Sequence, residues 1–276
     1  MSKIVLITGA SSGIGKSTAK HLAANGYTVY GAARRTGLMN ELKNAGIKLL
    51  EMDVTDEQSV KTGIDTIIRS HGKIDILINN AGFGSYGALE EVSITDAKYQ
   101  MEVNVFGAMN VTKMALPFMI ENNYGKIVNI SSIGGKVASP LGGWYHASKF
   151  AMEALSDSLR NEVRDFGVDV IVIEPGGIKT EWGGIAADNL LKVSGDGRYA
   201  EMAHKFADTL RVVDSKFGMD PIVIAQLIEK ALTASQPEAR YAAGFMAEEV
   251  LEMRKHMSDR ELDKVLTNRF EINQKQ

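Results

Sequence analysis

The stretch Thr8-Gly9-Ala10-Ser11-Ser12-Gly13-Ile14-Gly15 is the one that decides the fold of this chain. It follows a short apolar run, KIVLITG at 3–9, and precedes an amphipathic stretch that begins at Lys16. Glycines permit a tight turn and let backbone N–H groups approach a pyrophosphate at a helix N-terminus, where the helix dipole favours negative charge. The hydroxyls of Ser11 and Ser12 can donate to the same phosphates. The spacing G-x-x-x-G-x-G is weak by itself, but the strand–loop–helix context favours a nucleotide site.

Short apolar runs alternate with longer amphipathic stretches along the first two thirds of the chain. The runs lie at 3–9, 28–34, 47–54, 74–82, 125–132 and 168–176, and the expected helices at 16–24, 56–71, 94–122 (with a possible break near Pro117) and 145–166. Continuous apolar strands suit a parallel sheet buried on both faces. The alternation predicts an α/β fold, a Rossmann-like doubly wound parallel sheet with helices on both faces. Ligands of such sheets bind beyond the carboxyl ends of the strands.

The pattern changes after residue 180, where helical stretches carry glycine breaks and the segment from 240 to the end is charged and amphipathic. We expect one domain over 1–276. Residues 1–182 would form the cofactor-binding and catalytic core. Residues 183–276 would form a helical substrate lid and C-terminal helices.

Composition narrows the class of function. The chain has 276 residues, 24% of them charged, and a net charge of -3, so nothing draws it toward nucleic acid. It has no cysteine, which excludes disulfides, thiolate metal sites and a cysteine nucleophile. The five histidines form no ligand cluster, so no metal is expected. The first apolar run is too short for a signal or a membrane span, and we expect a cytoplasmic protein without a transmembrane segment.

Tyr145 and Lys149 stand four residues apart in an expected helix, a spacing that places both side chains on one face. A free tyrosine has a pKa near ~10, and a nearby positive charge lowers it. The pair therefore fits a tuned acid/base. It also fits a core tyrosine beside a surface lysine, and these two residues alone leave both interpretations open.

Five motifs in order resemble the classical short-chain dehydrogenase/reductase family, over about residues 1–182. The loop TGASSGIG at 8–15 is similar to its cofactor loop, and Asn79-Asn80-Ala81-Gly82 follows the fourth strand as in the family. Ser132 stands thirteen residues before the tyrosine of YxxxK. Asn104 in EVNVFGA and the group Pro175, Gly176 and Thr180 after the sixth strand complete the resemblance.

The resemblance implies hydride transfer between a nicotinamide and a carbonyl or alcohol carbon. Tyr145 would be the general acid, and Lys149 would lower its pKa and bond the nicotinamide ribose. Ser132 would stabilise charge on the substrate oxygen, although a lone serine at a strand end, with Ser131 beside it, also fits a turn cap. Asn104 would hold a water in a proton relay to Lys149. It equally fits an asparagine that bonds backbone at a helix irregularity, and both roles can hold together.

The resemblance also implies where the cofactor lies. Asp53 would bond the adenine amino group. The alternative is that Asp53 is a turn residue or the N-cap of the following helix, although Thr55 and Asp56 are more natural caps for that helix. The family's cofactor contacts map onto Gly9, Ser11, Ser12, Gly13, Ile14, Gly15, Arg34, Arg35, Asp53, Val54, Asn80, Ala81, Gly82, Tyr145, Lys149, Pro175, Gly176, Ile178 and Thr180.

The end of the second strand predicts which nicotinamide cofactor is used. Ala33 occupies the position where NAD-specific relatives place an acidic residue that accepts from the ribose 2′-hydroxyl. Arg34 and Arg35 follow, and a guanidinium suits phosphate oxygens. Two arginines at a strand end are otherwise simply solvated, but the missing acid favours NADP(H) over NAD(H). Arg34 is the stronger candidate, since Arg35 can cover the adenine face.

The substrate is expected to be an apolar small-molecule carbonyl or alcohol: a steroid, a retinoid, or a lipid-derived or xenobiotic ketone or aldehyde. The long C-terminal region is similar to that of the steroid- and retinol-acting members. Candidate pocket residues are Phe83, Tyr86, Val137, Leu141, Trp144, Trp182 and the segment 201–219.

Two other functions stay open from sequence, a redox-neutral relative such as an epimerase or dehydratase and a non-catalytic NADP(H)-binding regulator. The form of the loop argues against the first, and the retained Tyr145 and Lys149 argue against the second. The stretches 94–122 and 145–166 carry more apolar residues than one sheet-facing stripe requires, for example Phe106, Met109, Phe150 and Leu155. We therefore expect a homodimer or homotetramer.

Overall fold

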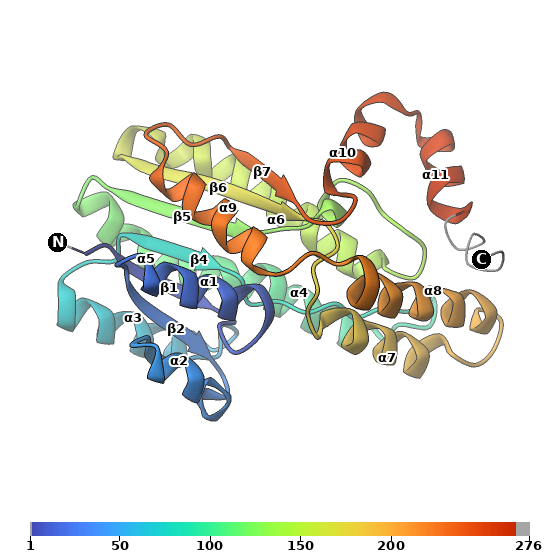
Figure 1. The fold of residues 1–276 in the computed structure, drawn as a ribbon, viewed down its shortest axis with the longest axis horizontal. Coiled ribbons are helices and arrows are strands. Elements are labelled where there is room, and N and C mark those ends of the chain that lie inside the picture. Colours follow the sequence, from blue (N-terminus) through green and yellow to red (C-terminus); the bar gives the residue numbers. More distant parts are fainter. Residues whose placement is uncertain (1, 269–276) are drawn as a thin grey trace.

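The computed structural model describes residues 2–268, which are built around a seven-stranded parallel sheet (Figure 1). The strands are β1 (Ile4–Thr8), β2 (Thr28–Ala33), β3 (Lys48–Glu51), β4 (Ile76–Asn79), β5 (Gly125–Ile130), β6 (Val168–Pro175) and β7 (Arg240–Ala243). Their spatial order is β3-β2-β1-β4-β5-β6-β7, so the direction of winding reverses between β1 and β4. The predicted Rossmann-like doubly wound sheet is confirmed, and a reversal of this kind is where such sheets bind ligands.

Eleven α-helices are formed by the described residues. They are α1 (Gly13–Ala24), α2 (Asn40–Asn44), α3 (Glu57–His71), α4 (Ile94–Met101), α5 (Ala108–Glu121), α6 (Gly143–Val163), α7 (Trp182–Ser194), α8 (Ala200–Val212), α9 (Ile222–Thr233), α10 (Ala247–His256) and α11 (Asp259–Asn268). Helices α7 and α8 lie beyond the arrowheads of the strands, and α10 and α11 lie on the other side of the same edge (Figure 1).

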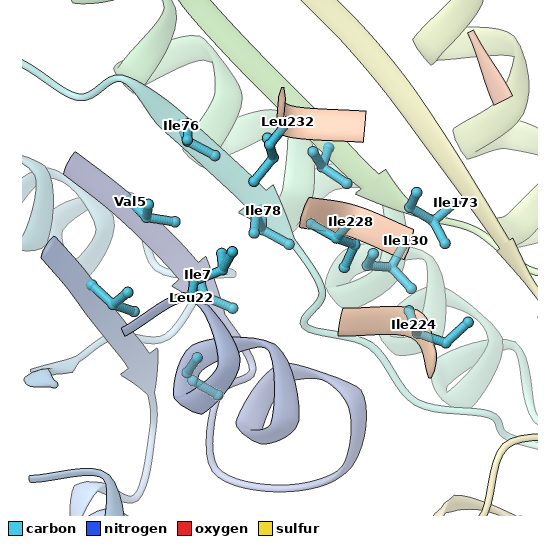
Figure 2. Close-up of a cluster of buried hydrophobic side chains, with 14 of the residues drawn as sticks. Val5, Ile7, Leu22, Ile76, Ile78, Ile130, Ile173, Ile224, Ile228 and Leu232 are labelled. Atoms are coloured by element: carbon cyan, nitrogen blue, oxygen red, sulfur yellow. The ribbon is translucent and has the colours of Figure 1, made fainter. Parts of the chain in front are cut away.

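Apolar side chains cover both faces of the sheet. On one face, Leu22 of α1 and Ile224, Ile228 and Leu232 of α9 pack against strand residues such as Ile78 (Figure 2). On the other face the packing side chains come from α3, α5 and α6, including Val60, Ile64, Ile67, Val111, Ala115, Met119 and Val163. Each fully buried side chain of this size contributes about 1.5–3 kcal/mol, which explains why the strands are apolar along their whole length.

The C-terminal third departs from the sequence-based expectation. Arg240–Ala243 forms β7, parallel to β6, where a charged helix was predicted. The cause is tertiary, because Arg240 bonds carboxylates of α6 and Gly244, at φ +109°, turns the chain after the strand. Helix α9 also belongs to the core, so residues 183–268 build part of the sheet domain as well as the region at the carboxyl ends of the strands.

The expected helix 94–122 is irregular near its start rather than at Pro117. A π turn, Glu102–Gly107, joins α4 to α5, while Pro117 lies inside α5. Proline has no N–H, so Pro117 leaves the carbonyl of Lys113 without its intrahelical donor. Both residues are exposed, so solvent can donate to that carbonyl instead. By length and composition Ile94–Glu121 is the one described helix able to cross a membrane, but its Met119 is buried in the sheet core.

Candidate active site

A cavity of about 650 Å³ opens at the carboxyl ends of the strands, a volume ordinary for a small-molecule site. The structure brings nearly every predicted cofactor residue to its wall: Gly9, Ser11, Ser12, Gly13, Ile14, Arg34, Arg35, Asp53, Val54, Asn80, Ala81, Gly82, Tyr145, Lys149, Pro175, Gly176, Ile178 and Thr180. Ser132 lies on the same wall. Gly15 and Asn104 are not among the lining residues and stand behind it.

Close backbone packing shapes the glycine loop. A Cβ on Gly9, at φ +66°, would lie 2.8 Å from the Cα of Ala81, and one on Gly15 would collide with the Asn80 amide. Asn80 Nδ2 donates to the carbonyls of Thr8 and Gly9 at 3.0 and 3.1 Å, and Thr8 Oγ1 accepts from the Asn80 N–H. Gly15 therefore serves the packing of the loop. The N-terminus of α1 is left facing the cavity, a cradle that fits a pyrophosphate.

The arginines after β2 stand at the rim. Ala33 is buried, whereas Arg34 and Arg35 are exposed on the cavity wall. Arg34 Nη1 donates to the hydroxyl of Tyr99 at 2.8 Å, and the Tyr99 ring packs against Phe83 at 5.6 Å between centroids. Tyr99 also lines the cavity. Sequence reasoning missed Tyr99, because nothing in its place on α4 signals a partner 65 residues away.

Asp53 takes up the turn geometry that the sequence left open. Its Oδ1 accepts from the backbone N–H and the hydroxyl of Thr55 at 3.0 and 2.8 Å. Asp56 caps α3, accepting from the N–H groups of Gln58 and Ser59. Asp53 still lines the cavity, so its contact with adenine stays a prediction.

Tyr145 and Lys149 lie on one face of α6, and both are buried, which excludes a surface lysine. Lys149 Nζ donates to the carbonyl of Ile130 at 2.9 Å and lies 5.9 Å from the centre of the Tyr145 ring. Burial raises the pKa of Tyr145 to about 12, while a hydrogen bond with Ser132 acts to lower it. Burial also lowers the pKa of Lys149 to about 8. The expected lowering of the tyrosine pKa by Lys149 is not found: burial is the main cause of the shift, and the lowering contribution comes from Ser132.

Ser132 and Asn104 both make the backbone contacts that the sequence left as alternatives. Ser132 Oγ accepts from the Gly134 N–H at 3.0 Å and also bonds Tyr145. Asn104, inside the π turn, accepts from the Phe83 N–H at 3.0 Å and donates to the Phe83 carbonyl at 2.9 Å. A Cβ on Gly82 would lie 3.2 Å from Asn104 Oδ1, so the asparagine sits directly behind the cavity wall. Its water relay stays a prediction.

His146 is a site residue that sequence reasoning missed. Its Nε2 accepts from the Ser139 N–H at 3.1 Å, so Nδ1 carries the proton and donates to the Gly134 carbonyl at 2.9 Å. Burial lowers the pKa of His146 and keeps it neutral. The imidazole thus ties the loop after Ser132 to α6. Its position beside Tyr145 in YHASK was the available signal.

Aromatic and aliphatic side chains form the rest of the cavity. Tyr86 and Trp182 lie 5.5 and 5.2 Å from Tyr145 between ring centroids. Of the other expected lining residues, Phe83 and Val137 reach the cavity, whereas Leu141 and Trp144 do not; Leu141 is buried in the cluster behind Tyr86. The segment 201–219 contributes Leu210, Val213 and Asp214 and none of its methionines, and further lining side chains are Ile185, Val250 and Leu266.

Residues 2–268 include no group of three histidine or carboxylate side chains arranged to hold a metal ion. Hydroxyl, ammonium and amide groups, among them those of Tyr145, Ser132, Lys149 and Asn80, line the cavity together with apolar side chains.

Residues 3–189 match the family model described as short chain dehydrogenase. The chain belongs to the short-chain dehydrogenase family. A 3-ketodihydrosphingosine reductase from Bacteroides thetaiotaomicron is 38% identical over 245 residues, spanning 88% of each chain. An NADPH-dependent 3-dehydrocapnine reductase from Ornithobacterium rhinotracheale is 35% identical over 252 residues, spanning 87% of each. The solved structure of a short-chain dehydrogenase from Streptomyces avermitilis has a TM-score of 0.80 at 30% identity and covers 99% of this chain and 97% of its own.

The family and the site agree on the class of reaction. As a short-chain dehydrogenase, the chain is an oxidoreductase of alcohol and carbonyl groups. The tyrosine, lysine and serine that the resemblance implied all line this cavity. The expected likeness to steroid- and retinol-acting members is not confirmed by these comparisons.

Proposed function

We propose that the chain transfers a hydride between NADP(H) and the carbonyl carbon of a lipid-derived ketone. The observation that carries this proposal is the meeting of Tyr145 and Ser132 at one wall of an apolar cavity, with the glycine loop and Arg34 at the same cavity. The site thus joins an acid for the carbonyl oxygen, a cradle for a pyrophosphate and donors for a phosphate.

The residues of the chain perform the proton chemistry. When bound, the nicotinamide supplies the hydride in reduction or takes it up in oxidation. In reduction, the carbonyl carbon gains the hydride and its oxygen takes the proton of the Tyr145 hydroxyl, so one C–H and one O–H bond form as the C=O π bond breaks. Ser132 donates to the same oxygen and stabilises its developing charge. The Lys149 ammonium stabilises the phenolate left on Tyr145, which regains a proton from solvent.

The burial that raises the pKa of Tyr145 to about 12 suits the reducing direction. A phenol with a raised pKa keeps its proton at neutral pH until the carbonyl oxygen becomes strongly basic. The same burial makes the charge on Lys149 more influential, because charges interact more strongly away from water. Asn104, behind Gly82, completes the proposed path for the returning proton through a water that it would hold.

Three features support NADP(H) over NAD(H). Ala33 supplies no carboxylate for a ribose 2′-hydroxyl, and Arg34 and Arg35 stand at the rim where a 2′-phosphate would lie. Tyr99 holds the Arg34 guanidinium toward that rim. A relative 35% identical to the chain is named for its dependence on NADPH.

The apolar cavity and the relatives together favour a lipid-derived ketone among the classes expected from sequence. The wall around Tyr145 is built from Phe83, Tyr86, Trp182 and Ile185, which would accept an alkyl chain. The names of two relatives, a 3-ketodihydrosphingosine reductase and a 3-dehydrocapnine reductase, support the same class of substrate.

NADPH oxidation with a panel of ketones tests the proposal. The panel holds 3-ketodihydrosphingosine, a shorter alkyl ketone, a steroid ketone and retinaldehyde, each with NADPH and with NADH. We expect the highest kcat/KM for a long-chain ketone with NADPH, at least about tenfold above NADH, as a charge-assisted phosphate contact of roughly 1.5–3 kcal/mol requires. NADPH binding without turnover of any ketone would refute a reductase and favour a regulator.

We further propose that two copies of the chain associate through α5 and α6. Phe106 and Phe150 are 58% and 44% exposed, and Leu155 is exposed on α6. Phe106, Met109 and Leu116 border a shallow apolar groove over α5. Apolar side chains exposed this widely are costly in a monomer, and a two-fold interface would cover them.

A further inference from the structure

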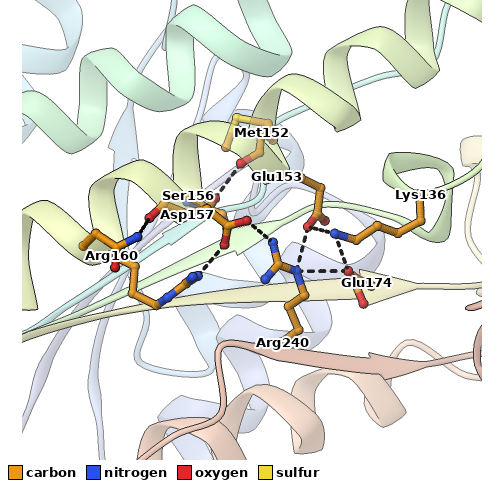
Figure 3. Close-up of polar contacts among 10 residues, drawn as sticks. Lys136, Met152, Glu153, Ser156, Asp157, Arg160, Glu174 and Arg240 are labelled. Carbon is orange, nitrogen blue, oxygen red and sulfur yellow. Dashed lines mark hydrogen bonds and ion pairs between the residues drawn. The ribbon is translucent and has the colours of Figure 1, made fainter. Parts of the chain in front are cut away.

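Six charged side chains form a cluster on and next to α6, the helix that carries Tyr145 and Lys149 (Figure 3). The proposed reaction does not use this cluster. They come from four places in the chain: Lys136 after the turn Ile133–Gly135, three residues of α6, Glu174 of β6 and Arg240 of β7. The α6 members are Glu153, Asp157 and Arg160. The cluster draws together segments more than 100 residues apart, and Glu153 lies between its two cations Lys136 and Arg240.

Glu153 is held by two cations. Its Oε2 accepts from Lys136 Nζ at 2.7 Å and from Arg240 Nε at 3.0 Å. Its side chain is only 6% exposed, and its Oε1 has no hydrogen-bond partner in the described part of the chain. Glu174 lies 3.6 Å from Lys136 and 3.5 Å from Arg240. A buried carboxylate fixed in this way interacts strongly with neighbouring charges, because little water screens it.

The neighbour that matters is Lys149. Glu153 follows it by four residues on α6, so both side chains lie on one face, a single turn apart. Gly135 packs across that turn, since a Cβ there would lie 3.0 Å from Glu153 Cγ and 3.2 Å from the Lys149 carbonyl. Lys149 makes no ion pair within residues 2–268. Burial lowers its pKa to about 8, and the charge of Glu153 acts in the opposite direction.

We propose that Glu153 is a positioning residue for the reaction, whose clamped carboxylate keeps the buried Lys149 in its ammonium form and thereby keeps Tyr145 reactive. The inference rests on the proposed function, because Lys149 acts there through Tyr145 and the cofactor ribose. Lys136 and Arg240 hold the carboxylate in place and also offset part of its charge.

The charged groups around Lys149 and Glu153 determine whether a substitution stabilises or destabilises the Lys149 ammonium. Tyr145 and Glu153 face Lys149 from α6, and Asn104 faces it from the π turn. Lys136, Glu174 and Arg240 face Glu153 from the turn, from β6 and from β7. With Glu153 neutral, two cations and one carboxylate remain, and this excess of positive charge disfavours the Lys149 ammonium. With Lys136 neutral, the opposite holds.

The pH profile of alcohol oxidation with NADP⁺ reads this out, because the active form needs a Tyr145 phenolate beside a Lys149 ammonium. In Glu153→Gln, weaker support for the ammonium moves the alkaline limb, which follows Lys149, to lower pH by about one unit. The acid limb does not move to higher pH, because the lost negative charge favours the Tyr145 phenolate. Lys136→Gln, at a more exposed site, moves the alkaline limb to higher pH. The matched control is Asp157→Asn, one turn further along α6, which loses its 2.7 Å bond to Arg240 and leaves both limbs unchanged.

NADPH affinity measured by fluorescence titration against pH gives a second readout without turnover. Wild type loses affinity as Lys149 deprotonates, Glu153→Gln loses it at a lower pH, and Lys136→Gln at a higher pH. Profiles of Glu153→Gln and Lys136→Gln that coincide with wild type in this titration overturn the proposal, whatever the loss in kcat. A wild type that binds NADPH but turns over no substrate refutes the proposed function, and the binding profiles then still decide the role of Glu153.

Discussion

Tyr145 combines two properties that rarely occur together, a buried hydroxyl and a position on a cavity wall. The rings of Tyr86 and Trp182 remove it from water, and Ser132 bonds its hydroxyl. Burial alone would leave an inert core tyrosine. In the proposed reaction, Ser132 and Lys149 at the same wall turn it into an acid for a substrate oxygen.

Replacing Tyr145 by phenylalanine removes only the hydroxyl. We expect kcat for ketone reduction to fall about 10²–10⁴-fold, the usual contribution of general acid catalysis, with little change in the dissociation constant of NADPH. Steady-state kinetics and a fluorescence titration measure the two quantities. A variant whose kcat stays within about threefold of wild type would remove Tyr145 from the mechanism.

Tyr99 offers a test of cofactor choice that spares the arginines themselves. Tyr99→Phe removes the hydroxyl that accepts from Arg34, so the guanidinium loses its anchor at the rim. We expect KM for NADPH to rise roughly 2- to 10-fold, as for one ordinary hydrogen bond, with KM for NADH unchanged. The control is Arg34→Met, which should lose more of the NADPH preference. Equal rises in both KM values would mean that Tyr99 acts on the fold and not on the phosphate.

At the scale of elements, the strands and the cofactor loop were predictable because local signals decide them. Continuous apolar runs gave six of the seven strands, and the glycine spacing before α1 gave the loop. The π turn at Glu102–Gly107 and strand β7 were not predictable in this way. Asn104 lies in the π turn and bonds the backbone of Phe83, 21 residues away, and Arg240 bonds carboxylates of α6 that are far away in sequence. The roles of Tyr99 and His146 were not predicted for the same reason, because tertiary structure determines which residues they contact.

The loop also allows a steric test. Gly15→Ala places a methyl group against Asn80 and the Gly9 carbonyl, both of which are held by hydrogen bonds. We expect this overpacking to cost about 1–3 kcal/mol of unfolding free energy and to weaken NADPH binding strongly. Gly37→Ala is the control, because a Cβ there meets nothing within 4 Å. Wild-type NADPH affinity in Gly15→Ala, measured by calorimetry, would contradict the packing described for the loop.

At the scale of the whole molecule, the proposed contact surface and the cavity share elements but not side chains. Phe106 lies in the π turn with Asn104, and Phe150 follows Lys149 on α6, yet both phenylalanines are exposed and neither lines the cavity. Assembly is therefore tested by mass. Light scattering at micromolar concentration should give a multiple of 30.0 kDa.

Phe106→Asp together with Phe150→Asp should reduce the assembly to the mass of one chain, because each places a charge in the proposed interface. Leu38→Asp, at a residue 58% exposed like Phe106, lies in the turn Thr36–Met39 between β2 and β3, away from α5 and α6, and it should leave the mass unchanged. A wild type with the mass of a single chain would end the proposal of a dimer.

The fate of the transferred hydrogen tests the central claim most directly. NADPH carrying deuterium at both C4 positions is incubated with the enzyme and 3-ketodihydrosphingosine, or with the best ketone of the panel, and the alcohol is analysed by mass spectrometry. We predict that each product molecule carries one deuterium on the carbon that was the carbonyl carbon, and that Tyr145→Phe forms far less of the same product. An alcohol without deuterium, or consumption of NADPH without any alcohol, would contradict hydride transfer at this site.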